Sequence, residues 1–533
     1  MNGLQRVYDS FQSLQKQYGP AAIKVLLAAL ILALHIFLGL AIVHNFKLSV
    51  ALLCFMSIGW LAAIYYFLLN PALDHFSPQI DAFSASIRQL WKRTVVRGIV
   101  YIALCAAFVV FLIIITSGSW IRKVSIGGLL FYIIVSIFLS NNPSRIKWRP
   151  VVWGVLLQFV AGLLVLRWSV GQVAFKFTSE QLVRFLEYTS NGTNFVFGFV
   201  ANPPIICGMD APFSFSSLPI IIYFGAITSV LFHYGVIQFI LVRVAWLMQY
   251  TMGTTAAESL NAAACIFIGP TEAAVLMRFA LPLMTSSELM AALTCGFSSI
   301  SGSLFAAYIS FGACPNYLLA ANVMSAPALL AVSKIMHPET QKSRQKDMTT
   351  FKLPKGSETS ALECLSNGAV QAVWFIFAII ASLIVFLALL ALLDSIIGTL
   401  GGMVGYHDLT FNVLVGYLFF PLAYIMGASD ATDPDAKIAE TLKVAQLMGS
   451  KTVLNEFIAY QQMSGMIMRK EIGPRAQMIA TYALCGYSNF SQIASQLAMY
   501  GSMCPQKKAV YAKVAFKSMI AGGIACFMTA CIA

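Results

Sequence analysis

A set of short polar motifs occurs twice in this chain, each time inside otherwise apolar sequence. The two copies are the strings GPTE, CGFSSIS and CP at residues 269–272, 295–301 and 314–315, and the strings NEF, CGYSNFS and CP at residues 455–457, 485–491 and 504–505. The spacing between the last two motifs is the same in both copies. An internal repeat of this kind indicates two related halves, each of which carries an acid and then a polar interruption into a hydrophobic segment.

Composition places both halves in a membrane. Of the 533 residues, 59% are hydrophobic and only 10% are charged, which is too few charged groups to cover a soluble fold of this size. The formal net charge of +13 is spread among short loops that fix membrane orientation, so nucleic acid is not an expected partner. The cysteines lie mostly in apolar runs, which favours packing over a metal centre. We therefore predict an all-α polytopic membrane protein in contact with the lipid bilayer.

Two segments fit re-entrant hairpins better than complete membrane crossings. A crossing helix needs about 20 apolar residues, and residues 253–282 are too short for this on either side of their Gly-Pro break. Pro270 also cannot donate the hydrogen bond that a helix interior requires. A hairpin with its tip near the midplane satisfies both facts. Residues 436–468 predict a second hairpin, with its tip at Asn455 and Glu456.

The remaining apolar segments predict membrane spans and interfacial helices, with about 11 transmembrane helices in all. The spans lie near residues 22–43, 48–69, 97–117, 125–141, 149–168, 213–246, 287–312, 317–336, 369–393, 476–503 and 509–531, and the interfacial helices near 170–188 and 409–426. The spans 287–312 and 476–503 contain the polar interruptions and are expected to be broken helices. We expect the basic loops 70–96, 141–150 and 334–355 in the cytoplasm. This puts the N-terminus in the cytoplasm, the C-terminus outside, and the two halves in inverted orientation.

Glu272 and Glu456 sit at the two predicted tips. An acid at membrane depth costs about 2.5–3.5 kcal/mol to insert, so an acid that persists there is a functional candidate. The alternative is a structural acid tied to a neighbouring helix end, and its recurrence at both tips makes this interpretation the weaker one. Inverted repeats, hairpins and broken helices that meet at the midplane are the architecture of a secondary transporter.

On this interpretation the chain divides into five parts. They are an N-terminal cytoplasmic segment with accessory transmembrane helices (1–146), scaffold helices with an interfacial helix (147–252), the first transport repeat (253–336), a basic cytoplasmic loop with a long scaffold helix and a second interfacial segment (337–435), and the second transport repeat with the last helix (436–533).

Five strings carry a resemblance to a known family. They are GPTEAAVLMRFALPLMTSSELMAALTCGFSSISGSLFAAYISFG, NVMSAPALLAVSKIMHPET, KTVLNEFIAY, ATYALCGYSNF and ACFMTACIA. Over roughly Lys147 to Ala533 the chain resembles the concentrative nucleoside transporters, and its three extra N-terminal spans resemble those of animal members. The resemblance implies a homotrimer in the plasma membrane in which each protomer carries nucleosides inward by symport with Na⁺ or H⁺. It implies no enzymatic activity and no cofactor other than the coupling ion.

The resemblance also implies which residues bind substrate and ion. The nucleoside-binding residues would be Pro270, Thr271, Glu272 and Leu304 around the base, and Glu456, Asn489 and Gln492 around the ribose. A carboxylate and a carboxamide suit vicinal hydroxyls, which donate to the first and exchange hydrogen bonds with the second. The implied sodium site consists of the side chain of Cys265, the carbonyls of Ile268, Ser299 and Ile300, and the hydroxyl of Ser299.

Three residues depart from the family's pattern. Pro270 replaces the usual Gln and so removes a bidentate contact to the base, and Gln492 replaces a Ser at the ribose. Cys265 replaces the Asn that ligates sodium, and a thiol is a poor ligand for a hard cation that prefers oxygen. This departure favours a proton, carried by Glu272 or Glu456, over sodium bound through the remaining oxygens.

Two other functions are compatible with the sequence. A relative with the same fold could carry a free nucleobase or another small polar metabolite, as Pro270 and Gln492 suggest. An intramembrane hydrolase could use Glu272 and Glu456 as a carboxylate dyad. The hydrolase is disfavoured because the acids recur at symmetric tips, with no nucleophile or metal-ligand set beside them.

Overall fold

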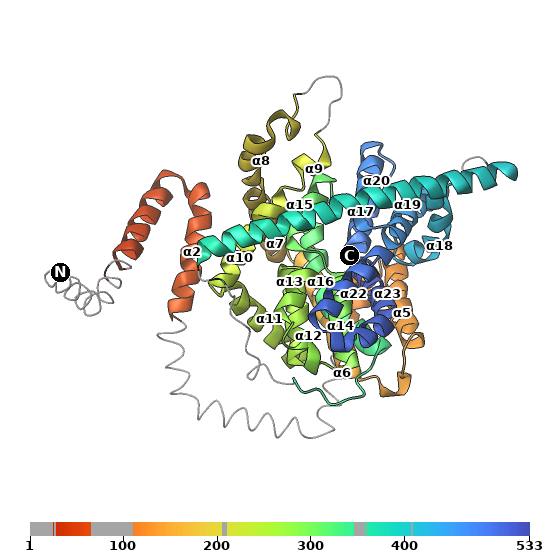
Figure 1. The fold of residues 1–533 in the computed structure, drawn as a ribbon, viewed down its shortest axis with the longest axis horizontal. Coiled ribbons are helices and arrows are strands. Elements are labelled where there is room, and N and C mark those ends of the chain that lie inside the picture. The colour runs from red at the N-terminus through yellow and green to blue at the C-terminus, as the bar shows by residue number, and fades with distance from the viewer. Residues whose placement is uncertain are drawn as a thin grey trace, which may run out of the picture. The chain divides into compact units, whose positions relative to one another are not determined.

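The computed structural model describes residues 25, 28–64, 110–204, 211–345, 358, 360–406 and 409–533. Every regular element within these residues is a helix, which confirms the predicted all-α class (Figure 1). The chain divides into two compact units, Met1–Ile115 and Thr116–Ala533.

The first unit contributes two apolar helices. They are Ala28–His44 and α2 (Phe46–Ile64), where the sequence predicts its first two spans. Trp60 Nε1 donates a 2.8 Å hydrogen bond to His35 Nε2, so this histidine joins the two helices. The predicted basic loop 70–96 and most of the predicted span 97–117 lie outside the described residues.

A set of scaffold helices precedes the first repeat. They are α5 (Trp120–Phe138), α6 (Trp148–Leu166), α7 (Ser169–Glu187), α8 (Thr189–Phe197), α9 (Phe213–Ser216), α10 (Ile220–His233) and α11 (Val236–Met252), with the 3-10 turns η2 (Pro143–Arg145) and η3 (Gly198–Val200). The sequence predicts one long span over 213–246 that is tilted or kinked, and the structure divides this segment completely at Gly235, where φ is 78°. Glycine adopts this left-handed conformation without steric cost, so α10 ends and a new helix begins there.

The first repeat contains the predicted hairpin and broken helix. The hairpin is α12 (Ala256–Phe267) and α13 (Pro270–Leu276), and the broken helix is α14 (Ser286–Ser298) and α15 (Gly302–Ser310), with η4 (Leu281–Leu283) before it and α16 (Pro315–Met336) after it. The hairpin turns at Gly269, where φ is 102°. Pro270 takes the first helical position of α13, where its missing N–H leaves no hydrogen bond unmade.

The second repeat contains the same elements in the same order. After α17 (Ala361–Met403) and α18 (Phe411–Ile425) come the hairpin α19 (Pro434–Val453) and α20 (Glu456–Met468), the broken helix α21 (Pro474–Leu484) and α22 (Phe490–Met503), then η6 (Pro505–Lys507) and α23 (Lys508–Ile532). Asn455 caps α20, because its Oδ1 accepts a 3.0 Å hydrogen bond from the N–H of Ile458. The second tip therefore lies where the sequence predicts it.

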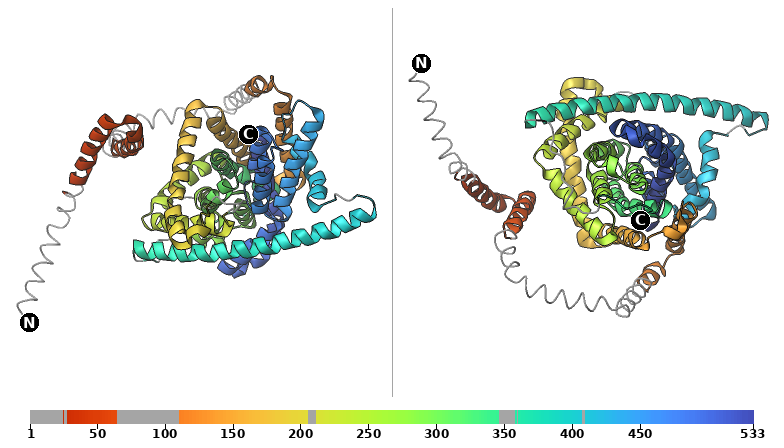
Figure 2. Two further views of the ribbon diagram at one scale, coloured as in Figure 1. Left: turned by 90° about the horizontal axis from the view of Figure 1, so that it is seen from above. Right: turned by 60° about the horizontal axis from the view of Figure 1, so that its bottom comes forward.

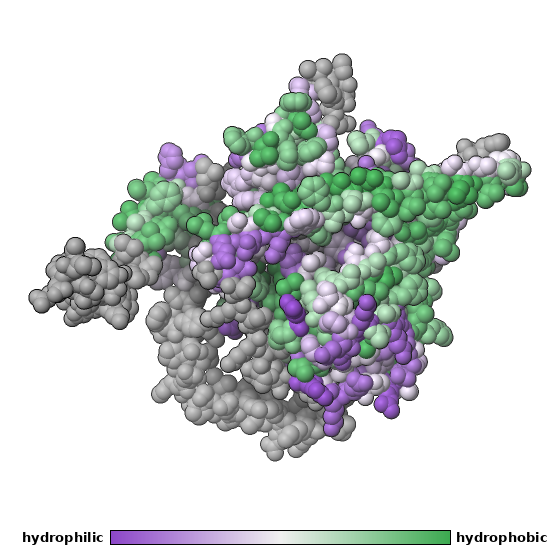
Figure 3. All heavy atoms as spheres, in the orientation of Figure 1, coloured by the Kyte–Doolittle hydropathy of each residue, from purple (hydrophilic) through white to green (hydrophobic). Residues whose placement is uncertain are grey.

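Helices α16 and α23 form the centre of the second unit. They pack against one another and bury 89% and 78% of their most apolar segments, whereas α17 buries 17% of its own. Figures 1 and 2 show α17 running along the outside of this unit. Figure 3 shows hydrophobic surface along α17. Its exposed hydrophobic side chains include Trp374 and Ile384.

Six helices of the described residues are long and apolar enough to cross a membrane. They are Trp120–Phe138, Trp148–Leu166, Phe213–His233, Pro315–Met336, Ala361–Met403 and Pro505–Ile532. These helices support a multi-pass membrane protein. The hairpin arms and broken helices are shorter, so the number of spans, their orientation and the five-part division of the chain stay predictions.

Candidate functional site

The second tip and the second broken helix meet at two of the predicted site residues. Glu456 begins α20 and is 4% exposed, and its Oε2 accepts a 2.8 Å hydrogen bond from Asn489 Nδ2. Asn489 in turn caps α22, since its Oδ1 accepts a 2.8 Å hydrogen bond from the N–H of Gln492. The N-terminal ends of α20 and α22 therefore converge on one carboxylate, where their partial positive charges stabilise a negative group.

A tyrosine of the first repeat completes this group. The hydroxyl of Tyr308, on α15, donates a 3.4 Å hydrogen bond to Glu456 Oε1, and its ring stacks on Tyr460 of α20 at 4.6 Å between centroids. The sequence analysis did not single out Tyr308, although it lies one helical turn after the predicted base contact Leu304. The site is thus built from both repeats.

The first tip presents a carboxylate without a partner. Glu272 and Thr271 are exposed, Pro270 and Leu304 are buried, and no described residue forms a hydrogen bond or ion pair with the Glu272 side chain. The first tip packs against Ser301 at Gly269, and α13 packs against α22, whose cap Asn489 binds Glu456. The structure therefore brings both predicted tips to one region, although no hydrogen bond links the two acids within the described residues.

The two unwound segments bond directly to each other. The N–H of Ser301, between α14 and α15, donates a 2.8 Å hydrogen bond to the hydroxyl of Tyr487, between α21 and α22. Gly486 has a φ of 97°, and a Cβ on it would lie 2.8 Å from the carbonyl oxygens of Phe297 and Ser298. Only glycine fits this close approach.

The predicted cation residues lie where the C-terminal ends of α12 and α14 meet. Ser301 Oγ donates a 3.4 Å hydrogen bond to the carbonyl of Ile268, and Asn322 accepts from the N–H of Ile300 while donating to the carbonyl of Ile266. Helix C-terminal ends carry partial negative charge, which favours a cation. The backbone oxygens therefore fit a hard cation.

The side chains at this place fit a hard cation less well than the backbone does. The Ser299 hydroxyl donates a 2.7 Å hydrogen bond to the carbonyl of Cys295 and keeps its lone pairs for a further partner. The Cys265 thiol is buried, and its sulfur lies 4.0 Å from the amide nitrogen of Asn261. Carbonyl and hydroxyl oxygens are suitable sodium ligands, whereas the thiol of Cys265 is not.

A cluster of charged side chains lies at the N-terminal ends of α12 and α14. The carboxylates of Glu258, Glu288 and Glu339 lie within 4.8 Å of one another. Lys334 Nζ pairs with Glu258 and is 3.7 Å from Glu339, so the Lys334 ammonium balances part of the negative charge of these carboxylates. The sequence does not predict this cluster, because Glu258, Glu288 and Lys334 lie in three different helices, α12, α14 and α16.

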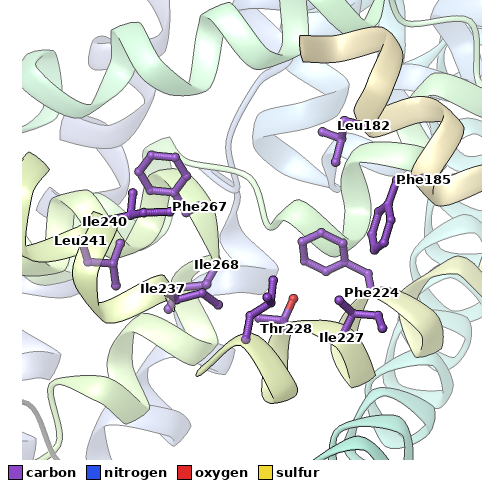
Figure 4. A pocket seen from close by; sticks show the side chains of 11 residues that line it. Leu182, Phe185, Phe224, Ile227, Thr228, Ile237, Ile240, Leu241, Phe267 and Ile268 are labelled. Atoms are coloured by element: carbon purple, nitrogen blue, oxygen red, sulfur yellow. The ribbon is translucent and has the colours of Figure 1, made fainter. Parts of the chain in front are cut away.

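A cavity of about 230 Å³ lies beside the first tip (Figure 4). Its wall includes Phe267 and Ile268 from the hairpin and side chains of α7, α10 and α11, and Thr228 contributes the single polar side chain of the lining. A nucleoside or another polar metabolite would find almost no hydrogen-bond partners here. The cavity is therefore not the substrate site.

Comparison with known proteins assigns the family. Sequence models described as "Na+ dependent nucleoside transporter C-terminus", "Na+ dependent nucleoside transporter N-terminus" and "Nucleoside recognition" match residues 317–533, 127–200 and 214–314. "Solute carrier family 28 member 3" of Eptatretus stoutii is 38% identical over 509 residues, which cover 92% of this chain and 72% of that protein. The chain belongs to the concentrative nucleoside transporter family. The predicted resemblance is confirmed.

Further relatives of this family member cover most of its length. "Sodium/nucleoside cotransporter 2" of Rattus norvegicus is 36% identical over 523 residues, which cover 96% of this chain and 76% of that protein. The solved "Structure of CNTnw in an inward-facing substrate-bound state" superimposes with a TM-score of 0.73 at 32% identity, over 78% of this chain and 97% of that one. This likeness shows that most of this chain shares the fold of that solved structure.

Proposed function

We propose that this chain is a secondary active transporter that imports nucleosides by symport with Na⁺ or H⁺. The observation that carries the proposal is the buried pair of Glu456 and Asn489 at two converging helix N-termini. A carboxylate accepts hydrogen bonds from hydroxyls, and a carboxamide both donates and accepts, so the pair suits the vicinal hydroxyls of a ribose. The named transporter relatives support transport rather than catalysis.

The first tip supplies the surroundings of the base in this proposal. Thr271 and Glu272 offer a hydroxyl and a carboxylate, while Pro270 and Leu304 offer apolar contact. Pro270 has no side-chain donor or acceptor, so base recognition depends on Glu272. Gln492 lies one helical turn from Asn489 and would reach the ribose with a longer amide side chain.

The coupling ion is either a proton or sodium. Cys265 favours a proton, since its thiol is a poor sodium ligand, and Glu272 or Glu456 would carry it. The sodium alternative uses the carbonyls of Ile268, Ser299 and Ile300 with the Ser299 hydroxyl. The relatives named as sodium cotransporters support this alternative.

The resemblance to the family is the ground for a proposed assembly and location. We propose a homotrimer in the plasma membrane with a cytoplasmic N-terminus and an extracellular C-terminus. The exposed apolar side chains along α17 are consistent with lipid or a second copy as neighbour.

Uptake of radiolabelled uridine and adenosine into liposomes that contain the protein tests the proposal. Sodium is replaced by choline, at pH 5.5 and at pH 7.5. Saturable uptake that survives without sodium and rises at acid pH supports proton coupling, and uptake that vanishes without sodium supports the oxygen site. Absence of uptake of both nucleosides would refute nucleoside import.

A nucleobase or another small polar metabolite is the second candidate function. The observation that favours it is the loss of a polar side chain at Pro270 together with the longer Gln492. Saturable uridine uptake would exclude it, and uptake of uracil without uridine would support it.

A further inference from the structure

Lys451 is the most deeply buried basic side chain in the described part of the chain. It lies in the last turn of α19, five residues before Glu456, and its relative exposure is 0%. The other buried basic residue there, Lys334, is paired with carboxylates. No described carboxylate pairs with Lys451 within hydrogen-bond range, so something else must compensate its charge.

Backbone carbonyls at the end of α21 compensate the charge of Lys451. Lys451 Nζ donates hydrogen bonds of 2.9 Å to the carbonyl of Ala483 and 3.2 Å to the carbonyl of Cys485. These are the last carbonyls of α21, which have no partners within their own helix. Lys451 itself stands in the last turn of α19, so the partial negative ends of two helices meet at one ammonium.

The aligned carbonyl in the first repeat accepts from neutral donors. The repeated motif aligns Cys295, in the last turn of α14, with Cys485, the residue that directly follows α21. The Cys295 carbonyl accepts from the Ser299 hydroxyl at 2.7 Å, whereas the Cys485 carbonyl accepts from Lys451 and from the thiol of Cys526, also at 2.7 Å. The two repeats therefore place donors of different charge on aligned carbonyls near the ends of α14 and α21.

We propose that the Lys451 ammonium is the permanent cation of the second repeat, holding the ends of α19 and α21 together where the first repeat uses an exchangeable cation. It lies five residues before Glu456 in the same hairpin, and the carbonyls that it binds precede Asn489 by four and six residues. Lys451 is thus a positioning residue for the Glu456 and Asn489 pair. A consequence is that only the first repeat takes up a coupling ion at its helix ends. The inference rests on the sodium alternative of the proposed symport, in which the ion binds at the ends of α12 and α14.

Chemical rescue of a lysine deletion tests this role. Lys451→Ala removes the amine and leaves space for ethylammonium, whereas Lys451→Met removes the charge and fills the space. The full-length protein is purified in detergent, and its melting temperature is measured while ethylammonium chloride replaces choline chloride at constant ionic strength. Lys443→Ala is the matched control, because Lys443 lies on the same helix and pairs with Glu471 at 2.9 Å, partly exposed.

We expect ethylammonium to raise the melting temperature of Lys451→Ala in a saturable way, and to leave Lys451→Met, Lys443→Ala and the unchanged protein without this response. Maximal uridine uptake of Lys451→Met should fall about tenfold or more, because a buried charge network loses its cation. Absence of rescue in Lys451→Ala, or the same response in all variants, would overturn the proposal.

The remaining outcomes are also decisive. If Lys451→Ala cannot be purified, Lys451→Met decides the matter, since unchanged uptake in that variant would overturn the role of the charge. Rescue of Lys451→Ala, together with no uptake of either nucleoside by the unchanged protein, would uphold Lys451 and refute import. Nucleoside uptake by the unchanged protein, without ethylammonium rescue of Lys451→Ala, would uphold import and refute the role of Lys451.

Discussion

The carboxylate of Glu456 has a different environment from that of Glu272. Glu456 is buried and accepts hydrogen bonds from Asn489 and Tyr308, while Glu272 is exposed without a partner among the described residues. A carboxylate with fixed donors is pre-organised for one ligand geometry, and an exposed carboxylate can adapt to several. We therefore expect Glu456 to set the requirement for ribose and Glu272 to set the preference among bases.

Glu456→Gln tests the ribose contact. We expect uridine uptake at low concentration to fall about 10- to 100-fold, because a hydrogen bond to a charged group contributes about 1.5–3 kcal/mol. Uptake is measured in liposomes at equal protein content. Glu471→Gln is the control, since Glu471 pairs with Arg469 and Lys443 in a loop between helices. Unchanged uptake in Glu456→Gln would contradict the proposed site.

Cys265→Asn tests the choice of coupling ion. An amide oxygen in place of the thiol should lower the half-saturating sodium concentration about tenfold, because sodium prefers oxygen ligands. Sodium is titrated in the uridine uptake assay. Cys314→Asn serves as control, since Cys314 caps α16 outside this site and asparagine is a good cap. Equal sodium response in both variants would show that the Cys265 side chain is not a ligand.

At the scale of elements, the unwound segments depend on glycine where they touch. We expect Gly486→Ala to lower stability by about 1–3 kcal/mol through backbone strain, with a further loss from its contact with Phe297 and Ser298. Gly312→Ala is the matched control, because Gly312 has a φ of 84° but nothing within 4 Å of an added Cβ. Melting temperatures of both variants are compared. An equal decrease would mean that the contact between segments adds nothing.

The hairpins and breaks could be predicted because local sequence encodes them. A glycine and a proline force the turn at Gly269, Asn455 caps a helix, and the repeated motif marks both interruptions. The break at Gly235 was missed because a single glycine inside an apolar run is compatible with a continuous span. Tyr308, Tyr487 and Lys451 were also missed, since their partners lie far away in sequence and only packing brings them together.

At the scale of the whole molecule, the proposed homotrimer predicts the mass of the purified protein. We expect the purified protein to have about three times the chain mass of 58.1 kDa after subtraction of detergent. Light scattering coupled to size-exclusion chromatography measures this mass. A single-chain mass in several mild detergents would contradict the homotrimer.

The unwound segments of the two repeats are in direct contact. The N–H of Ser301 bonds to Tyr487, and Gly486 packs on Phe297. A change that weakens one unwound segment therefore also destabilises the other, which lies almost two hundred residues away in sequence. Suppressor genetics would then pair distant parts of the chain: second-site changes that restore growth after damage at Gly486 should cluster around residues 297–301. The duplicated halves are therefore constrained to evolve together.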